Sequence, residues 1–385
     1  MAVKKSILQC IKLCIMHHRI DKLNQQLDSL LCQACLNQFN PQALNIHIQS
    51  LIDKGADVNL QGNWLDKKNT LLLFAISTHN QGLCQYLLNK KADVNCSNAN
   101  GITPLLLAIS KYDTLIPKLL KCGAKIDTCD KQGITPLMRA AKYGKHRLVS
   151  YLLSKGAKIS LTDKHRQSVL FYTGSNAQIT KTLLEKGANP AQESLSGKNP
   201  LFLAQDVQVV EMLLEYGADV NKQDLEKRTP LMTMANNPKL AKVLLKYGAD
   251  PKMRDSVQDT ALHFAQNPQS IQLLLQAGAD IDAQGYGQET PLLRLAKNPY
   301  VTLKTIQTLL RYHPLPLQPI SDKGFGKSNT KDTALSTDTL SIWSYIRDPK
   351  IKKVLLNYQE KYGKKKKHTN KRLTSYRTRL YFKTI

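Results

Sequence analysis

Four cysteines near the N-terminus are the first residues whose type and spacing suggest chemistry. Cys10 and Cys14 form a Cys-x3-Cys pair, and Cys32 and Cys35 form a Cys-x2-Cys pair. Four soft ligands at such spacing are able to hold a structural zinc ion. However, the first pair is one residue wider than the commonest zinc pattern, and its i, i+4 spacing among Ile and Leu suits small side chains at a helix interface. We therefore predict core packing and no metal, with zinc as the alternative.

A second motif, Gly-Phe-Gly-Lys-Ser at 324–328, is similar to the end of a phosphate-binding loop. Its leading glycine would fall at Ser321, and three prolines precede it where a strand is required. A polar linker is therefore the better interpretation. The sequence has no metalloprotease, nucleophile-elbow, kinase or dinucleotide motif. We predict a protein that is not an enzyme and has no cofactor.

Charge sets the class of partner. The 385 residues carry 55 Lys and Arg against 29 Asp and Glu, a net charge of +26, so acidic partners are favoured. All eight cysteines precede residue 130, which is unlike a disulfide framework and indicates reduced thiols. The best apolar run near the N-terminus, 7–16, contains Lys12, so we expect neither a signal peptide nor a membrane anchor. The expected location is cytoplasmic, with the nucleus or delivery into a host cell as alternatives.

An internal repeat positions everything else. A tract of the form Leu-(Leu/Ile)-x-x-Gly-Ala-x-(Val/Ile/Pro) occurs eight times, with Lys91 replacing the glycine once. The copies span 51–58, 87–94, 119–126, 152–159, 183–190, 213–220, 244–251 and 274–281. Glycine at such a place is typical of a helix end, where the backbone turns left-handed.

A second tract, Thr-Pro-Leu or a related tripeptide, lies between successive glycines. It starts at residues 70, 103, 135, 168, 199, 229, 260 and 290. Thr, Ser and Asn cap the free amides of a helix start, and Pro suits the first helical position. Each unit is therefore predicted to run turn, helix, short turn, helix, glycine.

The two intervals within a unit differ in regularity. The distance from the glycine position to the next Thr-type position is 12 residues seven times in succession, from Lys91 to Thr290. From the Thr-type position to the closing glycine it varies between 18 and 21. We expect a connection of fixed length, because it sets the step from one stacked unit to the next. The turn between paired helices should absorb the deletions.

Together these tracts resemble the ankyrin repeat, whose pattern is nearly complete at 134–159. The departures are that its histidine is kept only at His263 and its Gly-His turn is lost after residue 146. The resemblance implies an all-α ankyrin-repeat solenoid of helix-turn-helix units with hairpin connections, and we expect degenerate capping units at both ends. It also implies a non-catalytic scaffold that binds proteins with hairpin tips and first helices, which form a concave face.

The predicted organisation has five segments. One of them is a ninth and last repeat unit, in which residues 348–358 mirror residues 237–247 but no closing glycine follows. Residues 1–50 hold apolar helical stretches at 7–16 and 27–36. The segments are an N-terminal helical cap (1–50), the repeat array (51–312), a Pro/Gly/Ser/Lys linker (313–332), a C-terminal capping repeat (333–360) and a basic tail (361–385).

Basic and aromatic residues at the tips and first helices are the candidate contacts with a protein partner, which we expect to be acidic. Any one of them could equally be a solvated surface residue. The candidates are Lys131, Arg166, Lys198, Arg228 and Tyr286 at the tips and Arg139, Lys142, Tyr143, Arg294 and Lys297 on the first helices. We expect a monomer.

Trp64 is the one apolar candidate. The connection from Gly55 to Thr70 is 15 residues long instead of 12, and its insertion contains Trp64. Trp64 either anchors a partner or folds back onto the N-terminal cap, and the sequence favours neither.

The tail carries ten basic residues and no acidic one from Lys361 to Ile385. We interpret it as an import signal, a nucleic-acid contact or an anionic-membrane contact. Its candidate residues are Lys364, Lys365, Lys366, Lys367, Lys371, Arg372, Arg377 and Arg379. The leading hypothesis is thus a protein-binding scaffold, with a host-directed effector of an intracellular microbe as one form of it. The alternative is nucleic-acid or membrane association through the tail.

Overall fold

A helix pair followed by a hairpin is the repeated element of the structure, a computed structural model that describes residues 2–35, 41–64, 68–315 and 346–363. Within these ranges it leaves undescribed the side chains of 2–15, 34, 35, 41 and 363. The chain divides between Asn189 and Pro190 into two compact units, which we name the N-terminal unit and the C-terminal unit.

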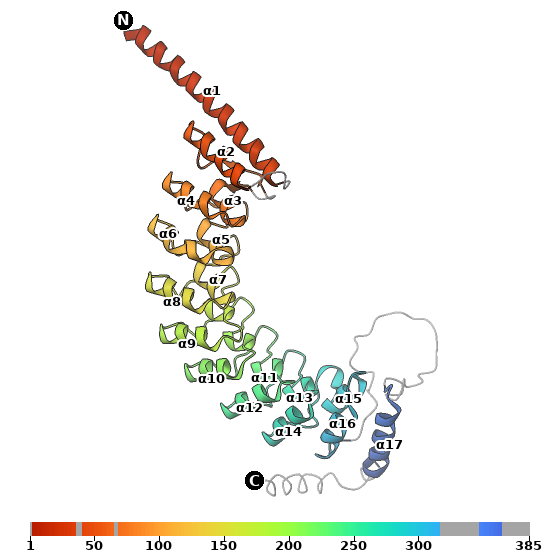
Figure 1. Cartoon of the computed structure of the whole chain (residues 1–385). Helices are drawn as coiled ribbons and strands as arrows, with labels where there is room; N and C mark the ends of the chain where they lie inside the picture. Colours follow the sequence, from red (N-terminus) through yellow and green to blue (C-terminus); the bar gives the residue numbers. More distant parts are fainter. Residues whose placement is uncertain (1, 36–40, 65–67, 316–345, 364–385) are drawn as a thin grey trace. The chain divides into compact units, whose positions relative to one another are not determined.

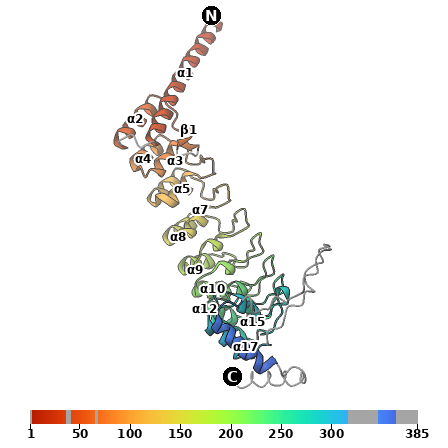
Figure 2. The ribbon, with the colours of Figure 1, turned by 90° about the vertical axis from the view of Figure 1, so that its right-hand side faces the viewer.

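The N-terminal unit begins with two helices and continues with four pairs. α1 (Ala2–Cys35) and α2 (Pro41–Asp53) precede an antiparallel hairpin of β1 (Gln61–Gly62) and β2 (Asn69–Thr70). The pairs are α3 (Leu71–Ser77) with α4 (Gln81–Asn89), α5 (Pro104–Lys111) with η2 (Asp113–Leu115) and α6 (Ile116–Lys121), α7 (Pro136–Lys142) with α8 (His146–Ser154), and η3 (Val169–Tyr172) with α9 (Ala177–Glu185). In this unit the second helices line one side (Figure 1), and the hairpins project from a common side (Figure 2).

The C-terminal unit continues the same order. Its pairs are η4 (Pro200–Leu203) with α10 (Val207–Glu215), α11 (Pro230–Thr233) with α12 (Pro238–Lys246), α13 (Ala261–Phe264) with α14 (Pro268–Gln276), and α15 (Pro291–Lys297) with α16 (Leu303–Leu310). A short turn, η5 (Tyr286–Gln288), precedes α15, and α17 (Pro349–Gly363) packs on α16. Across the described ranges of both units the two-residue strands are the only strands, so the expected all-α class is confirmed.

The predicted helix starts and stops are present. Thr103 and Thr135 accept a hydrogen bond from the amide three residues later, and a proline follows each of them. At the other end, Gly156 has φ +89°, and Ala157 N donates to Leu152 O at 3.0 Å, which closes the helix. Lys91, which replaces the glycine once, takes the same left-handed conformation at φ +62°.

The paired leucines of the second helices hold neighbouring units together. In each of the eight helix pairs, the first of the two adjacent leucines of the second helix is buried, with at most 1% of its surface exposed. These residues are Leu87, Leu119, Leu152, Leu183, Leu213, Leu244, Leu274 and Leu309. Each of these leucine side chains contributes about 1.5–3 kcal/mol to folding only when the neighbouring helix pair covers it. The stability of the N-terminal unit and of the C-terminal unit therefore accumulates from one helix pair to the next.

The deletions do not fall where we expected. The inter-helix turn was predicted to absorb them, but the first helix loses its last turn instead. The first helix has seven or eight residues in α3, α5, α7 and α15 and only four in η3, η4, α11 and α13. The prediction was wrong because the leucine that each first helix buries, such as Leu137 or Leu170, lies in its first turn, so the last turn can be lost without removing it.

Both ends also differ from the sequence interpretation. The apolar stretch 7–16 and the second stretch as far as Cys35 belong to one continuous helix, α1, instead of two. At the other end Ile351 and Leu355 of α17 are buried, and Asp348 accepts hydrogen bonds from the amides of Lys350 and Ile351. Residues 316–345, which include most of the predicted linker and the Thr333 start of the last unit, lie outside the described residues. The five segment boundaries stay predictions.

His263 caps α13 through its ring. Its Nδ1 accepts a hydrogen bond from Thr260 N at 3.0 Å, and its Nε2 lies 3.1 Å from the carbonyl oxygen of Glu289. Because a carbonyl only accepts, Nε2 carries the proton and Nδ1 is unprotonated. Burial lowers the pKa of His263, outweighing the opposite effects of the Glu289 carbonyl and Asp259. Protonation of His263 would also place an N–H on Nδ1 opposite the N–H of Thr260, so that two donors would face each other and the capping hydrogen bond would be lost.

Two glycines with similar backbone angles test how tightly the hairpins pack. Gly133 (φ +82°) lies on a hairpin, and a Cβ there would come within 2.9 Å of Lys164 N. Gly156 (φ +89°) ends α8, and a Cβ there would meet nothing within 4 Å. Alanine is strained at both by about 1 kcal/mol, but only Gly133→Ala adds a clash, worth about 1–3 kcal/mol. Urea denaturation followed by circular dichroism should therefore show the larger loss for Gly133→Ala. Equal losses would contradict close hairpin packing.

Stability of the C-terminal unit should depend on pH through His263. Its folded pKa lies below the unfolded value of 6.5, so its contribution is complete above that pH and is lost as the pH falls through the folded pKa. The urea midpoint should fall more steeply between pH 7 and pH 5 for the wild type than for His263→Gln, which keeps an acceptor at the cap. His165→Gln, at an exposed hairpin tip, is the control and should behave like the wild type. Parallel curves for wild type and His263→Gln would refute the assignment.

Candidate protein-binding surface

An acidic residue begins most hairpins, five residues before the next helix cap. Asp130 Oδ1 accepts hydrogen bonds from the amides of Gln132 (2.9 Å) and Ile134 (3.0 Å) within its own turn. The same two bonds, to the second and fourth following amides, recur at Asp163, Asp224 and Asp255, and Asn98 makes them with its amide oxygen. One side-chain oxygen thus fixes the turn in these five hairpins, and in the four that begin with Asp the second carboxylate oxygen remains for a side chain.

The second carboxylate oxygen of the hairpin aspartates forms ion pairs with two of the residues predicted to contact a partner. Arg139 pairs with Asp130 at 2.6 Å, and Arg228 pairs with Asp224 at 3.1 Å and with Glu226 at 3.0 Å. In the next hairpin of the N-terminal unit the hydroxyl of Tyr172 donates to Asp163 Oδ2 at 2.6 Å, and burial together with this bond raises the pKa of Tyr172.

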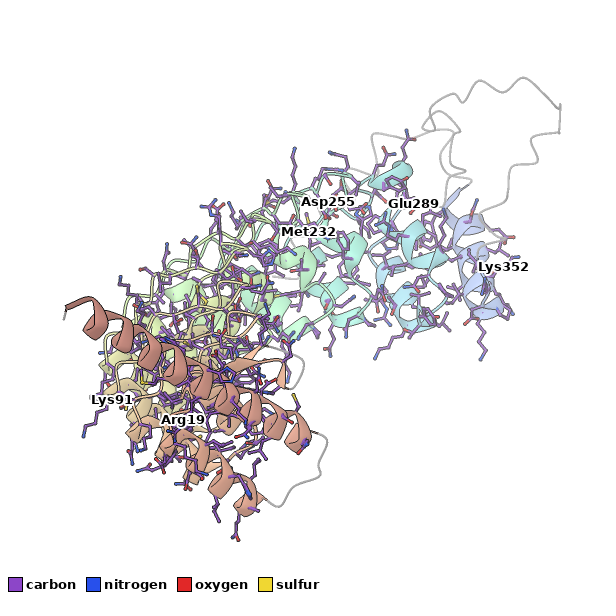
Figure 3. All side chains as sticks on the ribbon, turned by 90° about the horizontal axis from the view of Figure 1, so that it is seen from above. Arg19, Lys91, Met232, Asp255, Glu289 and Lys352 are labelled. Carbon is purple, nitrogen blue, oxygen red and sulfur yellow. The ribbon has the colours of Figure 1, made fainter. Side chains whose placement is uncertain are left out.

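The last repeat has a similar network. Arg294 pairs with Asp259 and, at 3.5 Å, with Glu289, and Lys297 pairs with Glu289 at 2.7 Å. Asp255 and Glu289 lie along one edge of the C-terminal unit (Figure 3). Arg139, Arg228, Arg294 and Lys297 are thus half-buried and paired with carboxylates, and contact of any of them with a partner stays a prediction. They join first helices and hairpins of their own unit.

Three predicted cations remain exposed. No carboxylate of the described residues lies within ion-pair distance of Lys131, Lys142 or Arg166. Lys198 is half-buried, 3.9 Å from Asp224 Oδ2 and 5.9 Å from the centre of the Phe202 ring.

The two predicted tyrosines are exposed. Tyr143 ends α7, with Lys145 Nζ 6.0 Å from its ring centre, and Tyr286 stands on a hairpin tip. Contact of either with a partner stays a prediction.

Trp64 does not serve as an exposed anchor. Its side chain is 1% exposed, and its indole nitrogen donates a hydrogen bond to Asp28 of α1 at 2.9 Å. Asn69 donates to the carbonyl oxygen of Trp64 at 2.6 Å. The anchor hypothesis is wrong, and the alternative, that Trp64 folds back onto the N-terminal helices, is correct. Burying a large ring against α1 stabilises the helix that opens the stack.

In the C-terminal unit a groove crosses the first helices of three successive helix pairs, α11, α13 and α15. It has a volume of about 460 Å3. Met232, Leu295 and the half-buried Phe264 give it an apolar floor, and Asn236, Gln266 and Asn298 give it an amide rim. Arg228 and Arg294 also line it, but with their ion pairs they offer little free charge. The groove suits a neutral peptide segment better than an acidic one.

Two apolar hairpin residues were missed by the sequence reasoning. Leu195 and Leu225 are exposed at the place where the N-terminal unit has Lys131 and Lys164. The signal was present, because each of these residues stands four positions before a Thr-type cap. Repeats were compared at their caps and glycines and not at this position.

The proposed zinc cysteines and the tail lie largely outside the described residues. Of Cys10, Cys14, Cys32 and Cys35, only the Cys32 side chain is described, and it is exposed. Among the described residues no three His, Cys, Asp or Glu side chains are grouped as a metal site. The tail residues from Lys364 to Arg379 are not described. No helix of the described ranges combines the length and apolarity that crossing a membrane requires.

Comparison with known proteins finds related sequences over parts of the chain. A 167-residue stretch is 31% identical to the palmitoyltransferase AKR1 of Lachancea kluyveri, covering 42% of this chain and 22% of that protein. A 127-residue stretch is 36% identical to the phosphocholine transferase AnkX of Legionella pneumophila, covering 32% and 12%. A 144-residue stretch is 29% identical to the putative ankyrin repeat protein L371 of Acanthamoeba polyphaga mimivirus, covering 36% and 19%. The chain thus spans less than a quarter of the length of these relatives.

Among solved structures, the ankyrin repeat domain of Bcl-3 aligns with 54% of this chain and 98% of its own, at 23% identity and a TM-score of 0.46. A family model for ankyrin repeats in three copies matches residues 31–127, 72–163, 111–194 and 202–285. These matches cover more than half of the chain and include the capped helix pairs, the glycine stops and the hairpins described above. The protein therefore belongs to the ankyrin-repeat family, and its fold is the all-α solenoid of that family.

Proposed function

We propose that the protein is a non-catalytic scaffold that binds an acidic segment of a protein partner along the hairpins of the N-terminal unit. Ankyrin repeats generally mediate protein–protein interactions, and membership of the family supports this part. The observation that carries the rest is that these hairpins bury their carboxylates and expose their cations.

The carboxylates of these hairpins form their hydrogen bonds and ion pairs with groups of the N-terminal unit itself. The Asp130 side chain is 9% exposed and Asp163 is buried, and each is held by two amides of its own turn and by Arg139 or Tyr172. Groups so held are structural, because a general acid or base needs an oxygen free to exchange a proton with substrate. The charge of Asp130 is also compensated by Arg139, so it does little to offset cations further out.

The exposed cations of these hairpins form what we call the basic row, Lys131, Lys164 and Arg166. The backbone holds successive hairpins in register, because Lys164 N donates to Gln132 O at 2.9 Å and Lys131 N donates to Asn100 O at 3.0 Å. Cations so aligned sum their potentials over the surface. An acidic segment is then attracted from about a Debye length, roughly 8–10 Å, and binds faster than a neutral one.

The alternative function, nucleic-acid or anionic-membrane association through residues 361–385, has no described residue beyond 363 to support it. It stays a prediction, as do monomeric state, cytoplasmic or nuclear location and a host-directed role.

Charge reversal of the basic row should weaken binding of an acidic peptide. We expect Lys131→Glu/Lys164→Glu/Arg166→Glu to lower the affinity for a fluorescent Asp/Glu-rich peptide of about 12 residues by at least about tenfold, because attraction becomes repulsion. Fluorescence anisotropy at about 50 and about 300 mM NaCl measures this and should show strong salt dependence for the wild type.

The matched control is Lys121→Glu/Lys155→Glu/Lys186→Glu, which makes the same charge change at the ends of second helices in the same unit. It should keep most of the affinity. If both triple variants lose affinity equally, net charge alone accounts for binding and the basic row is not the site.

A further inference from the structure

Positive charge is concentrated on the second helices of the N-terminal unit. The four second helices with their closing turns contain ten Lys and Arg against two carboxylates, and all of these cations except the half-buried Lys118 are exposed. The segments are 81–93, 116–125, 146–158 and 177–189. We name their exposed cations the second-helix face. The helices α4, α6, α8 and α9 line one side of this unit (Figure 1), and the hairpins project from another (Figure 2).

This charge does not simply reflect the composition of the chain. The hairpins and first helices between these segments contain seven Lys and Arg against four carboxylates, at 94–115, 126–145 and 159–176. The second helices and closing turns of the C-terminal unit contain five against five, at 207–219, 238–250, 268–280 and 303–315. The excess is therefore specific to one side of one unit, and a surface of one sign attracts the opposite charge.

The carboxylates near the second-helix face cancel little of it. Asp93 accepts hydrogen bonds from the amide of Asn95 at 2.8 Å and from the thiol of Cys96 at 3.0 Å, so it is held in its own turn. Glu185 lies 3.9 Å from Lys181 on an exposed helix, where an ion pair is weak. The remaining cations of the face keep their charge.

Contacts between neighbouring units hold the face in a fixed arrangement. The amide of Lys125 donates to Asn95 Oδ1 at 2.9 Å, and the amide of Lys158 donates to Asp127 Oδ1 at 2.9 Å. His146 Nε2 of α8 lies 3.1 Å from the hydroxyl oxygen of Thr182 of α9. The cations of successive units are thus presented together, and their potentials add.

The type of cation favours a broad anionic surface. Nine of the ten are lysines, which are compact, strongly hydrated point charges, whereas a single phosphate is best recognised by the planar fork of arginine. The rings that could stack on bases are covered, because Lys90 Nζ lies 5.6 Å from the centre of the half-buried Tyr86 ring and Lys155 Nζ lies 5.7 Å from that of Tyr151. A single-stranded nucleic acid would lack the stacking platforms on which it depends.

Apolar side chains are interleaved with these cations. Leu120 and Leu153 are half-buried on α6 and α8. Ile46 of α2, the helix that packs on α4, is 66% exposed. It stands five residues before Leu51, as Arg147 stands five residues before Leu152. Apolar groups beside cations suit the boundary between lipid headgroups and acyl chains, whereas a sugar–phosphate backbone gains little from them.

We infer that the second-helix face binds the anionic headgroup surface of a phospholipid bilayer. A bilayer is broad enough to meet the cations of several helices at once, and each lysine close to it strengthens binding about fivefold. This surface is separate from the basic row and from the tail, and the inference does not depend on the proposed function.

The test is sedimentation of the full chain with phosphatidylcholine vesicles that contain either no phosphatidylserine or about 30% of it. The face variant is Lys121→Glu/Lys155→Glu/Lys186→Glu, with the corresponding Gln variant in its place if it does not fold. The matched control, Lys239→Glu/Lys242→Glu/Lys246→Glu, makes the same charge change on α12 of the C-terminal unit. All variants are measured again with Lys364, Lys365, Lys366, Lys367, Lys371 and Arg372 changed to Gln, so that the tail does not mask the result.

The wild type should sediment with the phosphatidylserine vesicles only, and about 500 mM NaCl should release it. In both backgrounds the face variant should bind at least about twentyfold more weakly, and the control within about threefold of the wild type. The face variant is also the one expected to keep acidic-peptide binding, so a loss confined to vesicles separates this face from the basic row.

A second variant tests the apolar contact. Ile46→Ser should weaken vesicle binding about fivefold without changing net charge. Equal losses for the face variant and the control, or no vesicle binding once the tail is neutralised, would overturn the inference. So would binding of a fluorescent single-stranded RNA of about 20 nucleotides that the face variant abolishes, which would make the face a nucleic-acid contact.

Discussion

The backbone hydrogen bond that closes each hairpin is the constraint on which the repeat depends. In the seven hairpins that precede the caps from Thr103 to Thr290 the N–H of the first residue donates to the carbonyl oxygen of the fifth, as Asp130 N does to Ile134 O at 3.2 Å. At Asp130 a single oxygen takes two backbone N–H groups, and a buried charge so satisfied is stabilising where an unsatisfied one would be costly. The backbone bonds define a five-residue turn, and this turn is present in every unit whose distance from the closing glycine position to the next cap is 12 residues, while the helix pair varies in length. A hairpin of another length would break both bonds and shift the next pair relative to its neighbour.

The same constraint decides which charges face solvent. Asp130, Asp163 and Asp224 are held inside their turns, so their carboxylates are largely withdrawn from solvent. Their second oxygens also draw in Arg139 and Arg228, whose planar guanidinium groups suit a carboxylate better than lysine does. Lysines at the tips are left exposed. The division between structural arginine and surface lysine thus follows from the turn and requires no partner.

Local rules were enough to predict the helix pairs and not enough to predict the site. Thr135 and Gly156 each act on a helix end that lies within a few residues of them in the sequence, so the spacing of such residues alone was enough to locate the helix ends. The ion pair of Arg294 was not foreseen because its partner Asp259 lies 35 residues away, in the preceding repeat. The position of Trp64 was left undecided because its partner Asp28 lies 36 residues away, on a helix outside the repeats. Such contacts exist only after stacking. The shortening of η3 and η4 was missed for a related reason: both the turn and the helix end lack a fixed spacing in the sequence.

A stack of repeats allows surfaces of different chemistry to evolve separately, because each hairpin residue contacts only its own and adjacent units. Replacing Lys131 by an apolar residue changes one tip and leaves the buried leucines beneath it untouched. In the proposed function the basic row attracts an acidic partner from a distance and is screened by salt. The backbone hydrogen bonds between neighbouring hairpins hold Lys131 and Lys164 in register without taking part in that contact.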